Sequence, residues 1–112
     1  MGGIYSVCVA PFTGRLTRAV YFPDSLVTGV ATNNKKLAVE DRGPGGAASV
    51  EMGAVTFAAG QNGPANDDTA LTIPGTTAPD FLAGDIIAVR TVVNGTGMVL
   101  PAGTIELDLT RD

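Results

Sequence analysis

The sequence contains no histidine and no tryptophan, and it has a single cysteine, Cys8. Without histidine, the chain lacks the commonest general base, the Ser-His-Asp and Cys-His arrangements, and nearly every kind of zinc site. A hydrolase built on carboxylates would need two acids that converge in a cleft. Strand alternation instead predicts that the best-placed acidic residues turn toward solvent: Glu40, Asp41, Glu51, Glu106 and Asp108. We therefore predict a protein that is not an enzyme and that binds no metal ion and no cofactor.

Positive charge is also scarce, with 7 Lys and Arg residues against 11 Asp and Glu, which gives a formal net charge of -4. Such a chain has no basic field to gather phosphate groups, which argues against nucleic acid as a partner. No apolar run approaches the roughly 20 residues of a membrane span. The apolar start of the chain has no Lys or Arg before it, unlike a secretory signal peptide. We expect neither a nucleic acid nor a membrane partner.

Aromatic residues make up only 5% of the 112 residues, whereas 45% are hydrophobic, so the core must be built from aliphatic side chains. A chain of this length supports one core. Its 15 glycines and 7 prolines favour turns and interrupt every helical window, which suits many short strands. Cys8 cannot form an intrachain disulfide, and its position between Val7 and Val9 predicts a buried thiol that packs as a small hydrophobic residue.

Eight segments have strand character, and each is bounded by turn residues: Ile4–Ala10, Leu16–Phe22, Leu26–Thr32, Lys36–Asp41, Ala48–Phe57, Ala70–Pro74, Ile86–Val93 and Thr104–Thr110. In the last segment Ile105, Leu107 and Leu109 alternate with polar residues, which is the period of a strand with one wet face. The apolar run 86–93 predicts a central strand that is covered on both faces or lies in an interface. Seven or eight strands at this spacing predict an all-β fold, an antiparallel β-sandwich of the jelly-roll or immunoglobulin-like kind.

Glycine marks the predicted turns between these segments. Asn94-Gly95, directly after the run 86–93, predicts a hairpin or a short bulged loop. In Ala83-Gly84 and in Ala102-Gly103 the glycine is expected to supply a sharp turn into the next strand. Gly43-Pro44-Gly45-Gly46 and Asn66-Asp67-Asp68 are interpreted as turns, because they lack the motifs of a phosphate cradle and of a calcium loop.

The start of the chain differs from the rest, so we divide the sequence into an N-terminal segment, residues 1–23, and a β-sandwich domain, residues 24–112. No acidic residue precedes Asp24, and four of the six aromatic residues lie before it. Two interpretations stay open: an apolar, mildly basic arm that docks on a neighbouring subunit, or the first strands of the core. If the segment docks, the residues expected to bind the partner are Ile4, Tyr5, Val7, Val9, Phe12, Arg15 and Arg18.

From about Val27 to the C-terminus, the order of motifs resembles a family of small virion proteins of tailed bacteriophages, especially those of actinobacteria. The motifs are Thr28-Gly29-Val30-Ala31-Thr32-Asn33-Asn34, Asp41-Arg42-Gly43, Asp68-Thr69-Ala70-Leu71-Thr72-Ile73, Ala83-Gly84-Asp85, Gly95-Thr96-Gly97 and Pro101-Ala102-Gly103-Thr104-Ile105-Glu106-Leu107. The region before Asp24 lies outside the resemblance.

This resemblance implies a head decoration or cement protein, which binds the major capsid protein on the outside of the shell, often as a homotrimer, and strengthens it. It implies no catalytic residues, and it implies a location on the capsid exterior after assembly in the host cytoplasm. Two other functions stay open. One is a host-surface glycan-binding module of a head fibre or tail, for which a chain without Trp is poorly equipped. The other is a small jelly-roll oligomer of cellular origin, because Ala83-Gly84-Asp85-Ile86 also looks like strand entries in trimeric ligand domains.

Overall fold

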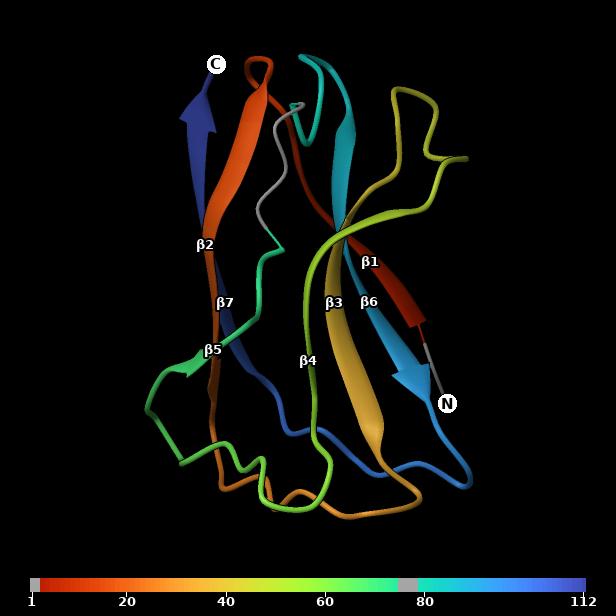
Figure 1. Cartoon of the computed structure of the whole chain (residues 1–112), viewed down its shortest axis with the longest axis vertical. Helices are drawn as coiled ribbons and strands as arrows, with labels where there is room; N and C mark the ends of the chain where they lie inside the picture. The colour runs from red at the N-terminus through yellow and green to blue at the C-terminus, as the bar shows by residue number, and fades with distance from the viewer. Residues whose placement is uncertain (1–2, 75–78) are drawn as a thin grey trace.

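The computed structural model describes residues 3–74 and 79–112, which form two antiparallel sheets (Figure 1). One sheet has four strands, in the order β1 (Gly3–Val9), β6 (Ile86–Val93), β3 (Lys35–Asp41) and β4 (Val50–Thr56). The other has three strands, in the order β5 (Thr69–Ala70), β2 (Gly14–Pro23) and β7 (Gly103–Arg111). The predicted all-β sandwich of seven or eight strands is confirmed. The described residues include no helix long and apolar enough to cross a membrane.

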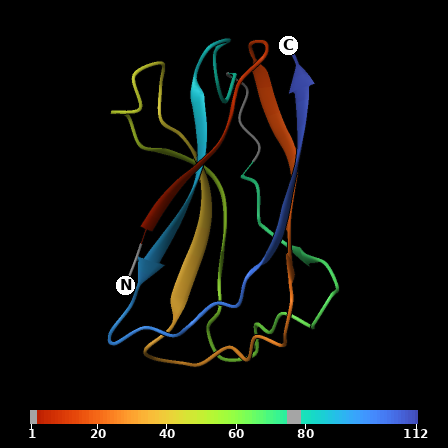
Figure 2. The ribbon, with the colours of Figure 1, turned by 180° about the vertical axis from the view of Figure 1, so that it is seen from behind.

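The two sheets lie face to face, as the front and back views show (Figures 1 and 2), and the core fills the space between them. Strand alternation turns Leu37 and Val39 of β3 toward Leu16 and Tyr21 of β2, and all four side chains are buried. Most of this core is aliphatic, as the composition predicts. Burial of one such side chain contributes about 1.5–3 kcal/mol, so the contact between the sheets is the main source of stability.

The two long sides of the sandwich differ. On one side, Ala70 pairs with Val20 of β2, and two residues later Thr72 forms a bridge with Ala54 of β4. The amide of Thr72 donates to the Ala54 carbonyl at 2.8 Å, and the amide of Ala54 donates back at 3.0 Å. This short segment therefore joins the two sheets. On the opposite side β1 and β7 are the last strands of their sheets, and nothing in the described part of the chain joins them.

The N-terminal segment belongs to both sheets. Residues 3–23 supply β1 to one sheet and β2 to the other, where β2 lies between β5 and β7. The order also differs from that of an immunoglobulin constant domain, in which the first strand lies beside the second, because here β1 pairs with β6. The sandwich therefore includes residues that the sequence division left outside it.

Six of the eight predicted segments become strands whose ends lie within two residues of the expected ends. Of the predicted segment Ala70–Pro74, only Ala70 lies in a strand, β5, and Thr72 forms an isolated bridge with Ala54. The segment Leu26–Thr32 is not a strand, and that prediction was wrong. Its backbone bonds to the loop 57–63 instead: Val27 and Gly63 form a bridge, and the amide of Val30 donates to the Phe57 carbonyl at 3.0 Å. The loop 57–63 therefore occupies the backbone amides and carbonyls with which this segment would otherwise pair with a neighbouring strand.

The predicted turns have mixed outcomes. A turn follows Asn94, with the amide of Gly97 donating to its carbonyl at 3.0 Å, but there is no hairpin, because β7 joins the other sheet. Gly84 has a φ of +91°, as its turn requires. Gly103 instead lies within β7, where a Cβ would sit 2.2 Å from the carbonyl oxygen of Phe22. Positive φ angles at Gly43, Gly46 and Asn66 confirm the turns in both polar loops.

Candidate protein-binding surface

The strand β1 is the most exposed apolar element of the fold, because six of its seven residues are exposed. We call four of its side chains the β1 surface; their exposed fractions are 51% for Ile4, 63% for Tyr5, 43% for Val7 and 61% for Val9. The strand contains neither a proline nor a charged residue, two of the features that keep edge strands from pairing with other chains. An uncharged apolar edge of this length is a surface on which another protein can pack.

Cys8 belongs to the same strand, and the prediction that its thiol is buried was wrong. The residue is exposed because β1 extends past the opposite sheet, so no layer covers it. Partial burial still raises the pKa of the Cys8 thiol above its ordinary value. The thiol therefore stays protonated near neutral pH, which is unlike an activated nucleophile.

The outer face of β1 carries Ile4 and Val9. Side chains alternate along β6, and Ile87 points into the core. Ile86 and Arg90, which lie one and three positions from Ile87, therefore point away from the core. Ile4 pairs with Arg90, and Val9 pairs with Ile86. The outer face of the sheet therefore presents Ile4 beside the Arg90 guanidinium toward one end of β1 and Val9 beside Ile86 at the other. The run 86–93 was predicted to be a central strand, covered on both faces or lying in an interface. The strand β6 is central in its sheet, but Arg90 is exposed, so the outer face of β6 is only partly covered.

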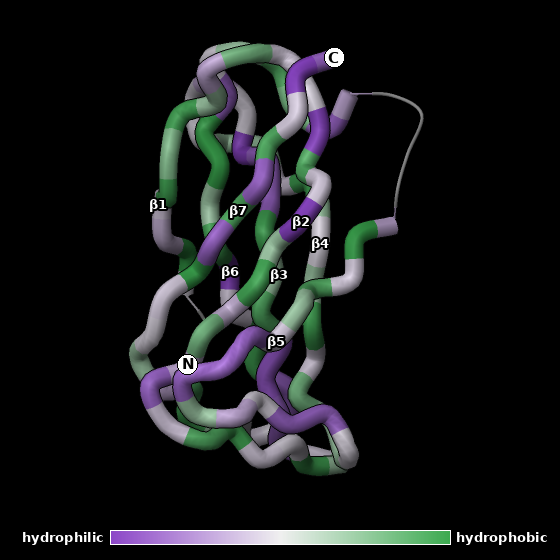
Figure 3. Tube along the Cα trace, turned by 90° about the vertical axis from the view of Figure 1, so that its left-hand side faces the viewer, coloured by the Kyte–Doolittle hydropathy of each residue, from purple (hydrophilic) through white to green (hydrophobic). Residues whose placement is uncertain are grey.

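The inner face of β1 carries Tyr5 and Val7, which border a groove between β1 and β7. Figure 3 shows the reason: β1 lies beyond β7, the last strand of the three-stranded sheet, so no strand lies opposite it. Two adjoining hollows of about 230 and 560 Å³ form this β1–β7 groove. They share most of their apolar walls, which come from Tyr5, Tyr21, Leu37, Val89 and Gly103.

Tyr21 closes the bottom of the groove. Its hydroxyl donates a hydrogen bond to the carbonyl of Pro101 in the segment that leads into β7. Burial raises the pKa of the Tyr21 phenol, and the charge of Asp24 adds to the effect, so the hydroxyl remains a donor at neutral pH. The contact holds the segment before β7, which also lines the groove, against the core.

The other predicted partner-binding residues do not join the β1 surface. Phe12 packs against Phe81, with ring centroids 6.2 Å apart, and the guanidinium of Arg111 lies 5.0 Å from its ring. Arg15 forms an ion pair with Asp112 at 3.2 Å, and Arg18 forms one with Glu106 at 2.6 Å. These two arginines belong to β2. The structure thus gathers the four residues of the β1 surface and separates them from Phe12, Arg15 and Arg18.

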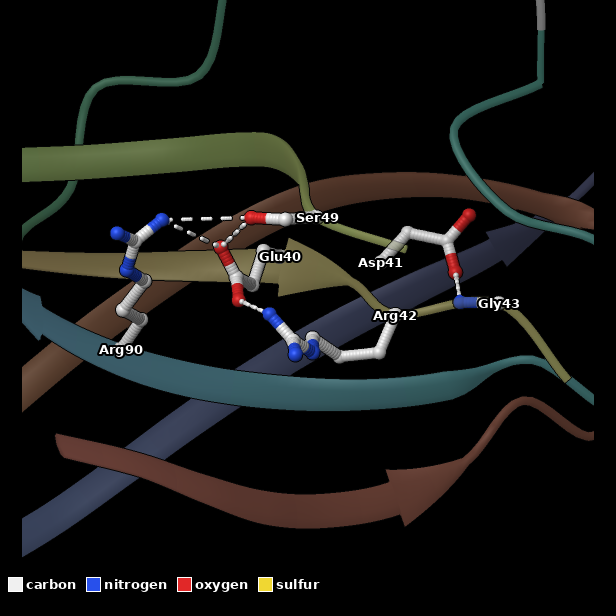
Figure 4. A network of polar contacts seen from close by, with 6 residues as sticks. All are labelled: Glu40, Asp41, Arg42, Gly43, Ser49 and Arg90. Atoms are coloured by element: carbon white, nitrogen blue, oxygen red, sulfur yellow. Dashed lines mark hydrogen bonds and ion pairs between the residues drawn. The ribbon is translucent and has the colours of Figure 1, made fainter. Parts of the chain in front are cut away.

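Glu40 was predicted to face solvent, and that prediction was wrong, because the residue is only 2% exposed. Its carboxylate lies on the outer face of the sheet beneath polar side chains (Figure 4). Arg42 donates to one carboxylate oxygen at 2.6 Å, and Ser49 donates to the other at 2.9 Å. The guanidinium of Arg90 lies 3.8 Å from the second oxygen. Both oxygens are satisfied, which is typical of a structural ion pair.

Asp41 points away from Glu40 in the same view (Figure 4). Its carboxyl is hydrogen-bonded to that of Asp85. Burial raises the pKa of Asp41, and the hydrogen bond to Asp85 and its charge add to this, against a lowering effect of the Gly43 amide. Asp85 is buried and also accepts from the Leu82 amide at 3.0 Å. Each carboxyl accepts a backbone amide of an adjacent turn, so the pair holds two loops in place.

Residues 3–74 and 79–112 contain no group of three Cys, Asp or Glu side chains that could hold a metal ion. No protein-family model, curated protein or solved structure matches the chain. The β1 surface offers exposed apolar side chains and the backbone groups of an edge strand. Sequence reasoning named the residues of β1 but missed the groove, because Leu37, Val89 and Ile105 look like ordinary core positions. Only the unequal size of the two sheets reveals it.

Proposed function

We propose that this protein is a structural virion protein that binds the major capsid protein on the outer surface of a bacteriophage capsid and stabilises the shell. The exposed, uncharged β1 surface carries the proposal, because it offers contact to protein rather than to a phosphate or a small polar substrate. The order of motifs from Val27 onward, which resembles small virion proteins of tailed phages, supports the particular class.

The proposed role needs no group that moves a proton. Many copies on a lattice each contribute a weak contact, and the repetition gives a large total affinity. Self-association as a trimer belongs to the proposal, since it brings three β1 surfaces to the lattice together. We assign the outer face, with Ile4 beside Arg90 and Val9 beside Ile86, to the capsid protein. The protein would then lie on the exterior of the virion after assembly in the host cytoplasm.

The test is to mix the purified protein with capsids that lack it. Co-sedimentation and cryo-imaging should show binding at fixed lattice sites, and the temperature at which the shell disrupts should rise. Ile4→Lys should weaken binding at least about tenfold, because a charge would enter an apolar contact. Leu26→Lys is the matched control, because Leu26 is equally apolar, is 63% exposed and lies far from β1 in the chain.

The possible outcomes separate the alternatives. Failure of the unmodified protein to occupy any lattice site overturns the proposed function. Equal binding by the two variants overturns the assignment of the contact to β1. Specific binding of the isolated protein to members of a glycan array would favour the host-surface glycan-binding module instead.

A further inference from the structure

The three-stranded sheet ends one strand short of the sheet that faces it. The strand β1 extends past β7, so the inner side chains Tyr5 and Val7 border a groove instead of packing against a strand. The free edge of β7 lies on the other side of the same groove, because β7 pairs with β2 alone among the described strands. An added strand beside β7 would use its unpaired backbone groups and would cover Tyr5 and Val7 at once.

We propose that the β1 strand of a second copy of this chain occupies the β1–β7 groove and adds to the free edge of β7. This inference rests on the self-association that the proposed function includes. In this contact β1 keeps its pairing with β6 of its own chain, so its four-stranded sheet continues into the three-stranded sheet of the other copy. The second copy brings the two features that the first one needs, which are an unpaired edge and exposed apolar side chains on the facing side.

The charge distribution makes the groove the place where two copies repel each other least. Each copy carries a net charge of -4, so two copies repel each other over most of their surfaces. The walls of the groove contain one charged residue, Lys35, and the strand β1 contains none. The acidic residues of β7, Glu106 and Asp108, lie on the outer face, where Arg18 is 2.6 and 3.9 Å from their carboxylates. The groove is thus a face on which an acidic copy meets no opposing carboxylate.

The test measures the association of the full chain by sedimentation over a concentration series. Val7→Lys should raise the dissociation constant at least about tenfold, because a Lys ammonium would enter the apolar groove. Val50→Lys is the matched control: Val50 is also an exposed valine, at 56%, and it lies on β4, the opposite edge strand of the same sheet. Circular dichroism and thermal melting of both variants establish that each one is folded.

Hydrogen exchange gives a second reading that does not depend on a substitution. Alternate amides of β7 point away from β2, and they should become protected as the concentration of the unmodified protein rises. A protein that stays monomeric up to about 1 mM overturns the inference. So does an oligomer whose dissociation constant is the same for Val7→Lys and Val50→Lys. A monomer that still decorates capsids overturns this inference and the proposed trimer but leaves the capsid role standing, whereas an oligomer that never binds capsids overturns only the capsid role.

Discussion

The carboxylate of Glu40 and the guanidinium of Arg42 form a 2.6 Å ion pair on the outer face of a sheet, yet both side chains are largely removed from water. Their side-chain exposures are 2% for Glu40 and 17% for Arg42. Ser49 and Arg90 complete the cover over the carboxylate. A buried charge without its partner is costly, so this pair ties the loop after β3 to the sheet.

Arg42→Ala should therefore destabilise the fold by about 3 kcal/mol, because the buried Glu40 carboxylate would lose its closest cation and a hydrogen-bond donor. Arg90→Ala is the control, with an expected loss below about 1 kcal/mol, since Arg90 is 44% exposed and lies 3.8 Å from the carboxylate. Urea unfolding monitored by circular dichroism measures both. Equal losses for the two variants would show that Arg42 is not the main partner of Glu40.

Asp41 predicts a pH dependence of stability. Its pKa in the folded protein is raised by burial first and then by Asp85, so the native state holds the proton more tightly than the unfolded chain does. The resulting stabilisation is present below the ordinary pKa of an aspartate and is lost as the pH rises through the raised pKa. Asp41→Asn can donate to Asp85 at every pH and can still accept from the Gly43 amide.

The free energy of unfolding of Asp41→Asn should thus exceed that of the unmodified protein by an amount that grows as the pH rises through this window. Denaturant unfolding at several values between about pH 3 and pH 8 measures the difference. Asp68→Asn, an exposed turn residue, is the control and should show no such growth. A constant offset for Asp41→Asn across the range would contradict the assignment to the pair with Asp85.

Local patterns predicted the strands that are regular along their own length. Ile105, Leu107 and Leu109 of β7 alternate with more exposed residues, as their spacing of two required. The run 86–93 likewise became a strand with the expected ends, in the interior of a sheet. In both cases the signal comes from neighbours in the chain, so no knowledge of the rest of the fold was needed.

The wrong predictions depend on partners that are distant in the sequence. Cys8 has apolar neighbours, but its exposure follows from the lack of a strand opposite β1. Glu40 alternates outward as expected, but Arg90, 50 positions later in the chain, helps to cover it. The same holds for the groove, whose walls come from five strands and from the segment before β7. The pairing order of the sheets decides each of these, and no local pattern encodes that order.

Gly29 lies where the segment Leu26–Thr32 packs closely against the loop 57–63, and it gives a third prediction. A Cβ at this position would lie 1.9 Å from the carbonyl oxygen of Ala58 and 2.2 Å from that of Gln61. Both obstacles are backbone atoms, so Gly29→Ala should cost about 2 kcal/mol or more. Gly45→Ala, where a Cβ meets nothing within 4 Å, should change stability by less than about 0.5 kcal/mol. Similar melting temperatures for the two variants would contradict the close packing of this loop.

Truncation separates the two interpretations of the N-terminal segment. Deletion of residues 1–8 removes most of β1, which lies at the edge of its sheet and exposes nearly all of its residues, so the shortened chain should remain folded. It should lose binding to capsids, because Ile4 of the outer face is removed, and binding to its own copies, because Tyr5 and Val7 of the inner face are removed.

Deletion of residues 1–23 should instead abolish folding, because it also removes β2, the middle strand of its sheet, with the buried side chains Leu16, Ala19 and Tyr21. Loss of each large core side chain costs about 2–5 kcal/mol. The deletion also removes the strand with which both β5 and β7 pair, so the total loss reaches the 5–15 kcal/mol, roughly, that stabilises an ordinary domain. Circular dichroism and thermal melting measure both deletions. A folded chain that begins at Asp24 would mean that β2 is dispensable, and the packing of the two sheets could not then depend on it.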